Sequence, residues 1–350
     1  MARRSFAEFG NALYTGEKSI DFVGRRKIWY GISIVLIIVA IVGPFLRGGF
    51  TFGIEFTGGS QFQVHIAEGG ERDLQIAIDT VESVLPGAAP RVSLVGQTDI
   101  RVQTEQLEDN QSRELHTALA DAYGVSDEEV TASYIGASWG QDITRQALVG
   151  LIVFILFAAL IMALYFRTWK MSLAALVALF HDLIITSGIY GLSGFEITPA
   201  AVIGFLTILG YSLYDTVVVF DKIRENTAPG ELTERRTFAE AVNLGVNQTL
   251  VRSINTSVVA LLPVGSILFI GAFVLGAGTL RDIALALFIG ILVGAYSTIF
   301  IAAPVYVQLR QGEDGIKKHD ARVLRARERE AAEGDAEGEL VEGTADEAVV

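Results

Sequence analysis

The chain has 350 residues, a formal net charge of −13, no cysteine and four histidines, and 51% of its residues are hydrophobic. A mean hydropathy of +0.44 is too high for a soluble protein of this length, so the lipid bilayer is expected to be its solvent. The absence of cysteine excludes disulfides and thiolate metal sites, and the spacing of the histidines excludes a histidine metal cluster. The sequence has no Walker loop, which excludes work powered by a nucleotide bound to this chain.

The first predicted elements are a polar, basic leader over residues 1–27 and a membrane span over residues 28–46. The apolar run Ile28–Phe45 is too long for the hydrophobic region of a signal peptide, and no A-x-A cleavage site follows it. We therefore predict an uncleaved membrane anchor.

Residues 47–145 are long enough to fold as a domain outside the membrane. Alternating polar and apolar residues predict strands, and a stripe at helical spacing from Leu74 to Leu85 predicts a helix that covers a sheet. The predicted elements are strand Ser60–Ile66, helix Glu71–Leu85, strand Arg91–Val95, strand Asp99–Thr104, helix Asn110–Tyr123 and strand Val130–Ile135. This β-α-β-β-α-β order is typical of a ferredoxin-like layer. No site is evident in it, so a binding role and a structural role both stay open.

Five further apolar runs predict five more spans over residues 146–310, because each approaches the roughly 20 residues that cross about 30 Å of hydrocarbon. The runs are Leu148–Phe166, Met171–Tyr190, Pro199–Phe220, Ile254–Leu275 and Ile283–Leu309. The expected fold class is a polytopic α-helical membrane protein with six transmembrane helices and one α+β ferredoxin-like extracytoplasmic domain between spans one and two.

Basic residues concentrate before the first span, in a loop over residues 223–250 and after the last span. By the positive-inside rule both termini and this loop are cytoplasmic, and residues 47–145 lie on the periplasmic or extracytoplasmic face. Within the loop, Phe238, Val242 and Val246 predict a short helix against the membrane, a partner or, as we favour, its own bundle. The tail over residues 311–350 lacks apolar periodicity and is predicted to be disordered.

An ionisable side chain inside an apolar span is the strongest functional signal in this sequence. Asp215 lies about 10 Å inside the cytoplasmic end of the fourth span, where a charge costs roughly 3 kcal/mol by insertion scales. Tyr211 and Ser212 share a helix face with Asp215, which makes a hydroxyl-lined stripe that ends in a carboxylate. We favour a proton or ion path over the alternative, a paired and inert packing contact.

Two further sets of polar residues accompany this carboxylate. The pair His181 and Asp182 lies near the middle of the third span and is equally compatible with a relay and with satisfied interhelical hydrogen bonds. Arg252 begins the fifth span, where it can reach the carboxylate or serve only as a positive flank of the membrane. Asn255 and Thr256 make the same face of that helix polar.

Just outside the first span the chain carries FGIEFTGG, Phe52–Gly59, which resembles a signature of the SecF family. Members of this family are the smaller of the paired SecD and SecF membrane subunits of bacterial protein export. The matching positions include Gly53, Gly58 and Gly59, whereas Glu55 stands where Asp is usual.

Three motifs inside the spans continue this resemblance in the same order along the chain. The third span carries the family's pair, His181-Asp182. The fourth carries GYSLYDTVVVFDKIREN, Gly210–Asn226, with Tyr214 where Asn is usual, and the fifth carries VNQTLVRSINTS, Val246–Ser257. Four motifs in one order and topology make a more specific match than any one of them.

The resemblance covers roughly residues 18–310 and implies a member of the RND transporter superfamily in the bacterial cytoplasmic (inner) membrane. The implied partners are SecD, which supplies a similar half of a joint bundle, the SecYEG channel, YajC as an auxiliary subunit, a translocating preprotein and the lipid bilayer. It implies no enzymatic activity, no nucleic-acid partner, and no metal or cofactor other than a proton gradient, or a sodium gradient in some organisms. The implied relay residues are Asp215, Arg252, Asp182 and His181, with Tyr211, Ser212, Tyr214, Asn255 and Thr256 as supporting polar groups.

Our hypothesis is an export-motor subunit in which proton flow past Asp215 and Arg252 drives movement of the outer domains. Two rivals stay open: a stand-alone RND-type small-molecule exporter that acts as an oligomer, and a non-conducting scaffold of a translocon. A single outer domain on half a bundle argues against the exporter. Export that survives Asp215→Asn would favour the scaffold.

Overall fold

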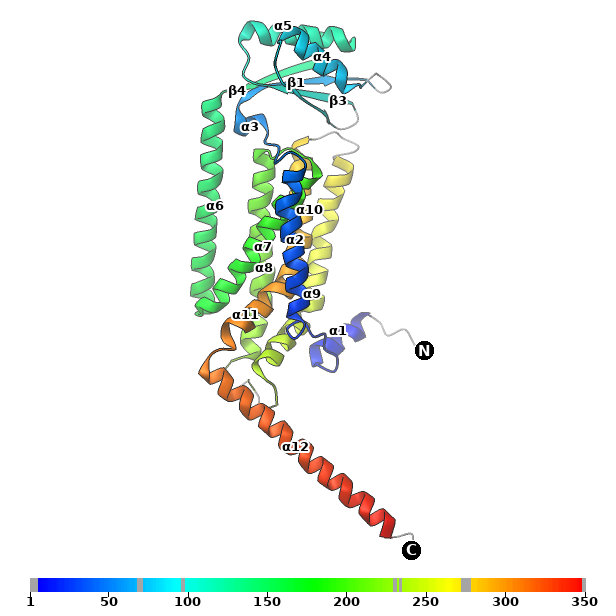
Figure 1. Ribbon diagram of the computed structural model, residues 1–350, viewed down its shortest axis with the longest axis vertical. Helices are drawn as coiled ribbons and strands as arrows, with labels where there is room; N and C mark the ends of the chain where they lie inside the picture. The colour runs from blue at the N-terminus through cyan, green and yellow to red at the C-terminus, as the bar shows by residue number, and fades with distance from the viewer. Residues whose placement is uncertain are drawn as a thin grey trace.

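A computed structural model describes residues 6–67, 72–95, 98–228, 232, 235–271 and 278–347. Figure 1 shows a bundle of long helices and, beyond one end of it, a small sheet with two helices on its far face. The segment between α2 (Arg26–Leu46) and α6 (Ala137–Phe166) forms this small outer part. We call it the outer domain.

Among the described residues, six helical segments are long and apolar enough to cross a membrane. They are built from α2, α6, α7 (Trp169–Ser193), α8 (Pro199–Asn226), α9 (Phe238–Ser266) with the π-turn η2 (Ile267–Gly271), and α10 (Gly278–Ser297) with the π-turn η3 (Thr298–Ala302) and α11 (Ala303–Arg310). The π-turn η3 ends two residues before Pro304, whose missing N–H removes one regular helical hydrogen bond. The chain is therefore a polytopic α-helical membrane protein, as predicted. Residues 272–275 of the predicted fifth run lie outside the described residues.

The predicted loop over residues 223–250 is largely helical. Helix α8 continues to Asn226, and α9 begins at Phe238 with a capping box in which Thr237 and Glu240 satisfy each other's backbone N–H groups. The buried face that starts at Phe238 and Val242 continues along α9 to Ser257 in the fifth span. The expected short helix is therefore the first half of α9, buried against its own bundle as we favoured.

The outer domain is one antiparallel sheet with strand order β2-β3-β1-β4. Its elements are β1 (Gly59–His65), α4 (Leu74–Val84), β2 (Arg91–Val95), β3 (Asp99–Thr104), α5 (Asp109–Tyr123), the short turn η1 (Asp127–Glu129) and β4 (Val130–Ile135). Successive side chains of a strand point to opposite faces of the sheet, which explains why the helices cover one face. Phe62 and Ile100 point from the strands to the helices, where Leu115 is fully buried against them. Glu71, the predicted start of the first helix, lies outside the described residues.

The opposite, polar face of the sheet contacts the loop between α7 and α8. Arg101 of β3 donates a hydrogen bond of 3.0 Å to Oε2 of Glu196, and Gln103 donates one of 3.1 Å to the same oxygen. The side chains of Arg101 and Glu196 are only 14% and 13% exposed. Two residues further on, Thr198 caps α8 and donates to Asp282 of α10. We call Arg101–Glu196 the docking ion pair.

The tail is helical, in contrast to the predicted disorder. Helix α12 (Asp314–Glu347) leads away from the bundle in Figure 1, and α1 (Phe6–Thr15) lies near the same end. The tail is rich in Ala, Glu and Arg, which are strong helix formers and carry no apolar period. Its first half is also anchored, because Val323 is fully buried and Arg327 pairs with Glu240 at 2.6 Å. Composition alone did not reveal these contacts.

Candidate functional site

Buried polar side chains gather inside the bundle where α7, α8, α9 and α10 meet. Helical spacing explains the α8 contribution: Ser212, Asp215 and Thr216 lie three and four residues apart and so share one face. The polar cluster, as we call it, comprises Ser33, His181, Asp182, Ser212, Asp215, Thr216, Ser253, Ser297 and Thr298. Each of these residues is 5% exposed or less.

Asp182 joins three helices within this cluster. Its Oδ2 accepts hydrogen bonds from Ser212 Oγ of α8 at 2.5 Å and from Ser297 Oγ of α10 at 2.8 Å. Its Oδ1 lies 3.1 Å from Nδ1 of His181, the neighbouring residue on α7. The carboxylate is therefore held by three partners and is only 1% exposed.

His181 extends these contacts to α2. Its Nε2 lies 3.2 Å from Oγ of Ser33, which in turn donates to the hydroxyl of Tyr296 at 3.3 Å. The rings of His181 and Tyr296 stack with their centroids 6.0 Å apart. A continuous series of hydrogen-bonding groups thus runs from α2 through α7 to α8.

Asp215 has a different environment from Asp182. Its Oδ1 accepts a hydrogen bond of 3.0 Å from Ser253 Oγ of α9. Its Oδ2 is buried and has no hydrogen-bond partner within the described part of the chain. Because a buried polar atom without a partner is costly, this oxygen is the position in the cluster best suited to take up a proton or small cation.

Hydroxyl-bearing residues lie on the face of α8 that also carries Asp215. Ser212, which donates to Asp182, lies one turn from Asp215 on the same face. Thr216 donates to the carbonyl of Ser212 at 3.0 Å, and its hydroxyl lies 3.0 Å from that of Thr298. These hydroxyls thus link α8 with α7 and with the π-turn η3.

Arg252 lies outside the polar cluster. Ser253 faces Asp215, and adjacent helical residues point about 100° apart, so Arg252 is turned to the exposed side of α9. The hydrogen bond that Asp215 accepts from α9 comes from Ser253, the neighbour of Arg252. With Asn255 and Thr256, Arg252 lines a groove of about 560 Å³ between α1 and α9.

The two tyrosines of the fourth-span signature lie nearer the bundle surface. Tyr214 is 55% exposed and points away from the polar cluster, while Tyr211 is half-buried. Of the supporting residues that we expected, Ser212 donates a hydrogen bond to a carboxylate of the cluster, that of Asp182.

Part of the fifth-span signature fixes the chain near the N-terminus. Asn247 accepts a hydrogen bond from the Ile20 N–H at 2.8 Å and donates one to the Ile20 carbonyl at 2.9 Å. Asn243, one turn earlier, accepts from the Phe22 N–H at 2.9 Å. We call these two residues the amide clamp. The sequence-based interpretation missed it, because nothing local pairs α9 with a segment more than two hundred residues away.

The glycine-rich outer motif connects the bundle with the sheet. It forms α3 (Ile54–Thr57), followed by Gly58 and Gly59, whose φ angles of 74° and 133° favour glycine. Gly53 donates its N–H to the Ile197 carbonyl at 3.0 Å, which ties the motif to the start of α8. Glu55 is half-buried within it. The motif thus lies at the junction of α2, the sheet and α8, far from the polar cluster along the bundle.

The sequence also missed the hydroxyls that complete the cluster, namely Ser33, Ser253, Ser297 and Thr298. Isolated serines and threonines in a span carry no distinctive spacing. One signal was available in Gly294 of α10, because a Cβ there would lie only 3.2 Å from that of Ser212. The missing side chain lets α8 and α10 approach closely enough for Ser212 and Ser297 to share Asp182.

The fold and the polar cluster define a class: a multi-pass helical membrane protein with ionisable groups between its spans and a domain outside them. Among the described residues, no group of three His, Asp or Glu side chains could hold a metal ion. Residues 115–312 match the family model described as "Protein export membrane protein SecD/SecF, C-terminal".

Curated relatives extend this match over nearly the whole chain. The Protein translocase subunit SecF of Streptomyces coelicolor is 46% identical over 97% of this chain and 88% of that protein. The Protein translocase subunit SecF of Mycobacterium tuberculosis is 41% identical over 91% of this chain and 73% of that protein. The chain belongs to the SecD/SecF family, which confirms the resemblance seen in its motifs.

A solved structure gives the same result. SecDF from Thermus thermophilus, described as a translocon-associated membrane protein, matches with a TM-score of 0.71 and 32% identity. The match covers 84% of this chain but only 39% of that chain. This chain therefore spans about two fifths of the length of that SecDF.

Proposed function

We propose that this chain is a SecF-like subunit of the Sec protein-export machinery, without enzymatic activity of its own. It acts with SecD and uses the proton motive force to promote preprotein translocation across the cytoplasmic membrane. The observation that carries this proposal is Asp215, a carboxylate with one oxygen bonded to Ser253 and the other buried without a partner in the described residues. No cofactor is needed beyond the ion gradient.

Proton binding at Asp215 would change contacts between helices. A charge inside the membrane is costly unless it is paired, so a protonated and an ionised Asp215 favour different neighbours. The Ser253 hydroxyl can donate to an ionised carboxylate, or accept from a protonated one. Alternation between these two bonds gives α8 and α9 two arrangements, and this is how a proton gradient could move the helices. A sodium ion at the unpartnered oxygen is the alternative that the experiment distinguishes.

Exposed polar groups on the bundle surface support a SecD partner. Tyr214 of α8 and Arg252 and Asn255 of α9 are exposed, although they lie on segments long enough to span the membrane. Such groups are stabilised when another protein segment or water covers them. A SecD half that covers this side would bring Arg252 into the interior of a joint bundle and complete the predicted relay with His181 and Asp182. SecYEG, YajC and the preprotein are the further partners of this assembly.

We also propose that both termini are cytoplasmic and that the outer domain is a ferredoxin-like extracytoplasmic domain. The basic leader and tail support this orientation through the positive-inside rule. The antiparallel order β2-β3-β1-β4 with α4 and α5 on one face supports the domain assignment.

The experiment compares the wild type with Asp215→Asn and with the control Asp221→Asn, an exposed carboxylate on the same helix. The chain is isolated from native membranes to identify its partners, and preprotein release from membrane vesicles is measured with and without a proton gradient. We expect SecD and SecY to be recovered with all three chains. Gradient-dependent release should be lost with Asp215→Asn only.

Two outcomes would contradict this proposal. Release that persists in Asp215→Asn while the partners are recovered would reduce Asp215 to a packing contact and favour a scaffold. Release that follows a sodium gradient in the wild type, and not a proton gradient, would assign the site to sodium.

A further inference from the structure

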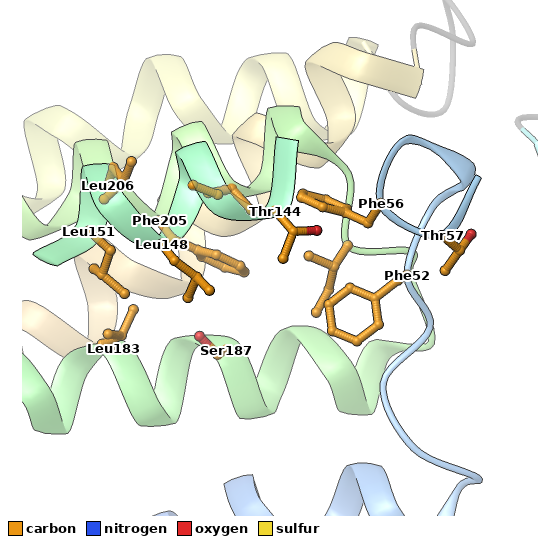
Figure 2. A pocket seen from close by; sticks show the side chains of 13 residues that line it. Phe52, Phe56, Thr57, Thr144, Leu148, Leu151, Leu183, Ser187, Phe205 and Leu206 are labelled. Carbon is orange, nitrogen blue, oxygen red and sulfur yellow. The ribbon is translucent and has the colours of Figure 1, made fainter. Parts of the chain in front are cut away.

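A cavity lies between α6, α7 and α8 in the outer part of the bundle and reaches the outer motif. It measures about 480 Å³, which is within the roughly 300–1,000 Å³ of typical ligand pockets. Figure 2 shows Phe52 and Phe56 of the outer motif at one end of it and leucine side chains of α6, α7 and α8 further along. The lining residues on α6 are Thr144, Ala147, Leu148 and Leu151. We call it the outer cavity.

The outer cavity begins at the membrane surface and extends into the hydrocarbon. Trp139, at the start of α6, is 59% exposed and is the kind of residue that marks a membrane–water interface. From Thr144 to Leu151 the cavity follows α6 for about 10 Å at 1.5 Å per residue. Leu148 lines the cavity and is itself 55% exposed. The cavity is therefore continuous with the lipid-facing surface of this span.

The outer domain and the α6–α7 turn keep the outer cavity from closing. At the outer end, Gly140 of α6 packs directly against the backbone of Phe56. At the other end, Ser172 of α7 donates to the Ala159 carbonyl of α6 at 3.2 Å, and Phe166 is buried in the main core. Helix α6 is thus fixed at both ends, and its middle cannot simply move onto α8.

The chemistry of the lining selects a ligand without hydrogen-bonding groups. Thr144 donates its hydroxyl to the Gly140 carbonyl at 2.9 Å, and Thr57 donates to the Gly58 carbonyl at 3.1 Å. The remaining hydroxyl belongs to Ser187. A polypeptide segment would bring backbone N–H and C=O groups that this lining does not satisfy, whereas a hydrocarbon chain brings none.

We propose that the outer cavity binds one acyl chain of a phospholipid from the extracytoplasmic leaflet. The chain enters beside Thr144 at head-group depth and lies along Leu148, Leu151 and Phe205. The lipid fills the space between α6 and α8 beneath the outer motif. This inference is independent of the proposed proton path.

The test reconstitutes the full chain in vesicles of phosphatidylethanolamine and phosphatidylglycerol that contain phosphatidylglycerol with a diazirine at the end of one acyl chain. After irradiation, the labelled residues are mapped by peptide mass spectrometry. The filling variant is Ala147→Phe, and the matched control is Val149→Phe, which lies on the same helix but outside the cavity lining. Val202→Phe fills the cavity from α8 and replaces the first variant if that chain does not accumulate.

We expect label on α7 and α8 lining residues such as Leu183 and Leu206 as well as on the exposed face of α6. Ala147→Phe should lower the α7 and α8 label roughly ten-fold, because two buried methylenes are worth about one decade in a binding constant. Val149→Phe should leave it unchanged. The proposal would be overturned by label that is confined to the exposed face of α6. It would also be overturned if the amount of label on α7 and α8 stayed the same in both filling variants, Ala147→Phe and Val202→Phe. An apolar peptide with the same diazirine that labels the cavity and displaces the lipid would overturn it as well.

Discussion

Substitution of Glu196 by Gln should release the outer domain from the bundle. The docking ion pair is nearly buried, and Glu196 accepts hydrogen bonds from both Arg101 and Gln103. Loss of one partner of a buried pair costs about 3–5 kcal/mol because the other charge stays uncompensated. Since both side chains are slightly exposed, we take the lower end, about 3 kcal/mol, which corresponds to roughly a hundredfold change in the docking equilibrium.

Hydrogen–deuterium exchange measures this change directly. The N–H of Gly53 bonds to the Ile197 carbonyl, and that of Ile197 to the Thr51 carbonyl, so exchange at these two amides reports separation of the outer motif from α8. We expect faster exchange there in Glu196→Gln, with no change in Glu105→Gln, an exposed carboxylate at the end of β3.

A second substitution tests whether the charges of Arg101 and Glu196, and not only their contact, hold the outer domain. Glu196→Gln is costly because it leaves the Arg101 charge uncompensated, so a double variant that also carries Arg101→Met should regain much of the protection that Glu196→Gln removes. The docking ion pair does not hold the outer domain if the Gly53 and Ile197 amides of Glu196→Gln exchange at the wild-type rate. The same conclusion follows if these amides exchange as fast in the double variant Arg101→Met/Glu196→Gln as in Glu196→Gln.

Three further predictions concern the bundle and its ends. Gly294→Val should lower stability by about 1–3 kcal/mol through overpacking against Ser212. A Cβ at Gly210 meets no atom within 4 Å, so Gly210→Val serves as the control, and thermal unfolding in detergent checks both. Asn247→Ala should cost about 2 kcal/mol, since it removes the acceptor of the Ile20 N–H while the Ile20 carbonyl keeps its hydrogen bond from Asn243. Exchange over residues 16–24 should rise, while the exposed control Asn255→Ala changes nothing. Hydrogen bonds from Arg310 and then Lys170 lower the pKa of Glu313 below its ordinary 4.5, so its stabilising contribution is complete above pH 4.5 and is lost as the pH falls below it through the folded-state pKa. Melting curves against pH should show this loss in the wild type and a weaker dependence in Glu313→Gln; equal dependence would refute the assignment.

The spans could be predicted because a bilayer imposes a length and a composition on any helix that crosses it. The six apolar runs therefore located the long helices, and Asp215 and Asp182 were prominent because charges are rare in such runs. The partners of these charges could not be predicted. Serines such as Ser253 and Ser297 are unremarkable in sequence, and they become partners only through the way the helices pack.

The errors at the helix ends have one physical origin. We divided the loop over residues 223–250 from the fifth span because its polarity changes, and we predicted a disordered tail because it lacks an apolar stripe. Local helix formation does not depend on either property, so α9 continues through the change in polarity and α12 forms from strong helix formers. Contacts across the chain, such as Arg327 with Glu240, then fix these helices in place.

The continuity of α9 has a mechanical consequence. This helix is one rod of 29 residues, about 43 Å long, with Ser253 near its middle and the amide clamp towards its first turns. A stiff rod transmits a tilt at its middle to both ends. We therefore expect a rearrangement of Ser253 around Asp215 to reach the backbone at Ile20, whose N–H and carbonyl are both hydrogen-bonded to Asn247. A spectroscopic reporter placed beside Ile20, well away from the carboxylate, should register each change in the occupancy of Asp215.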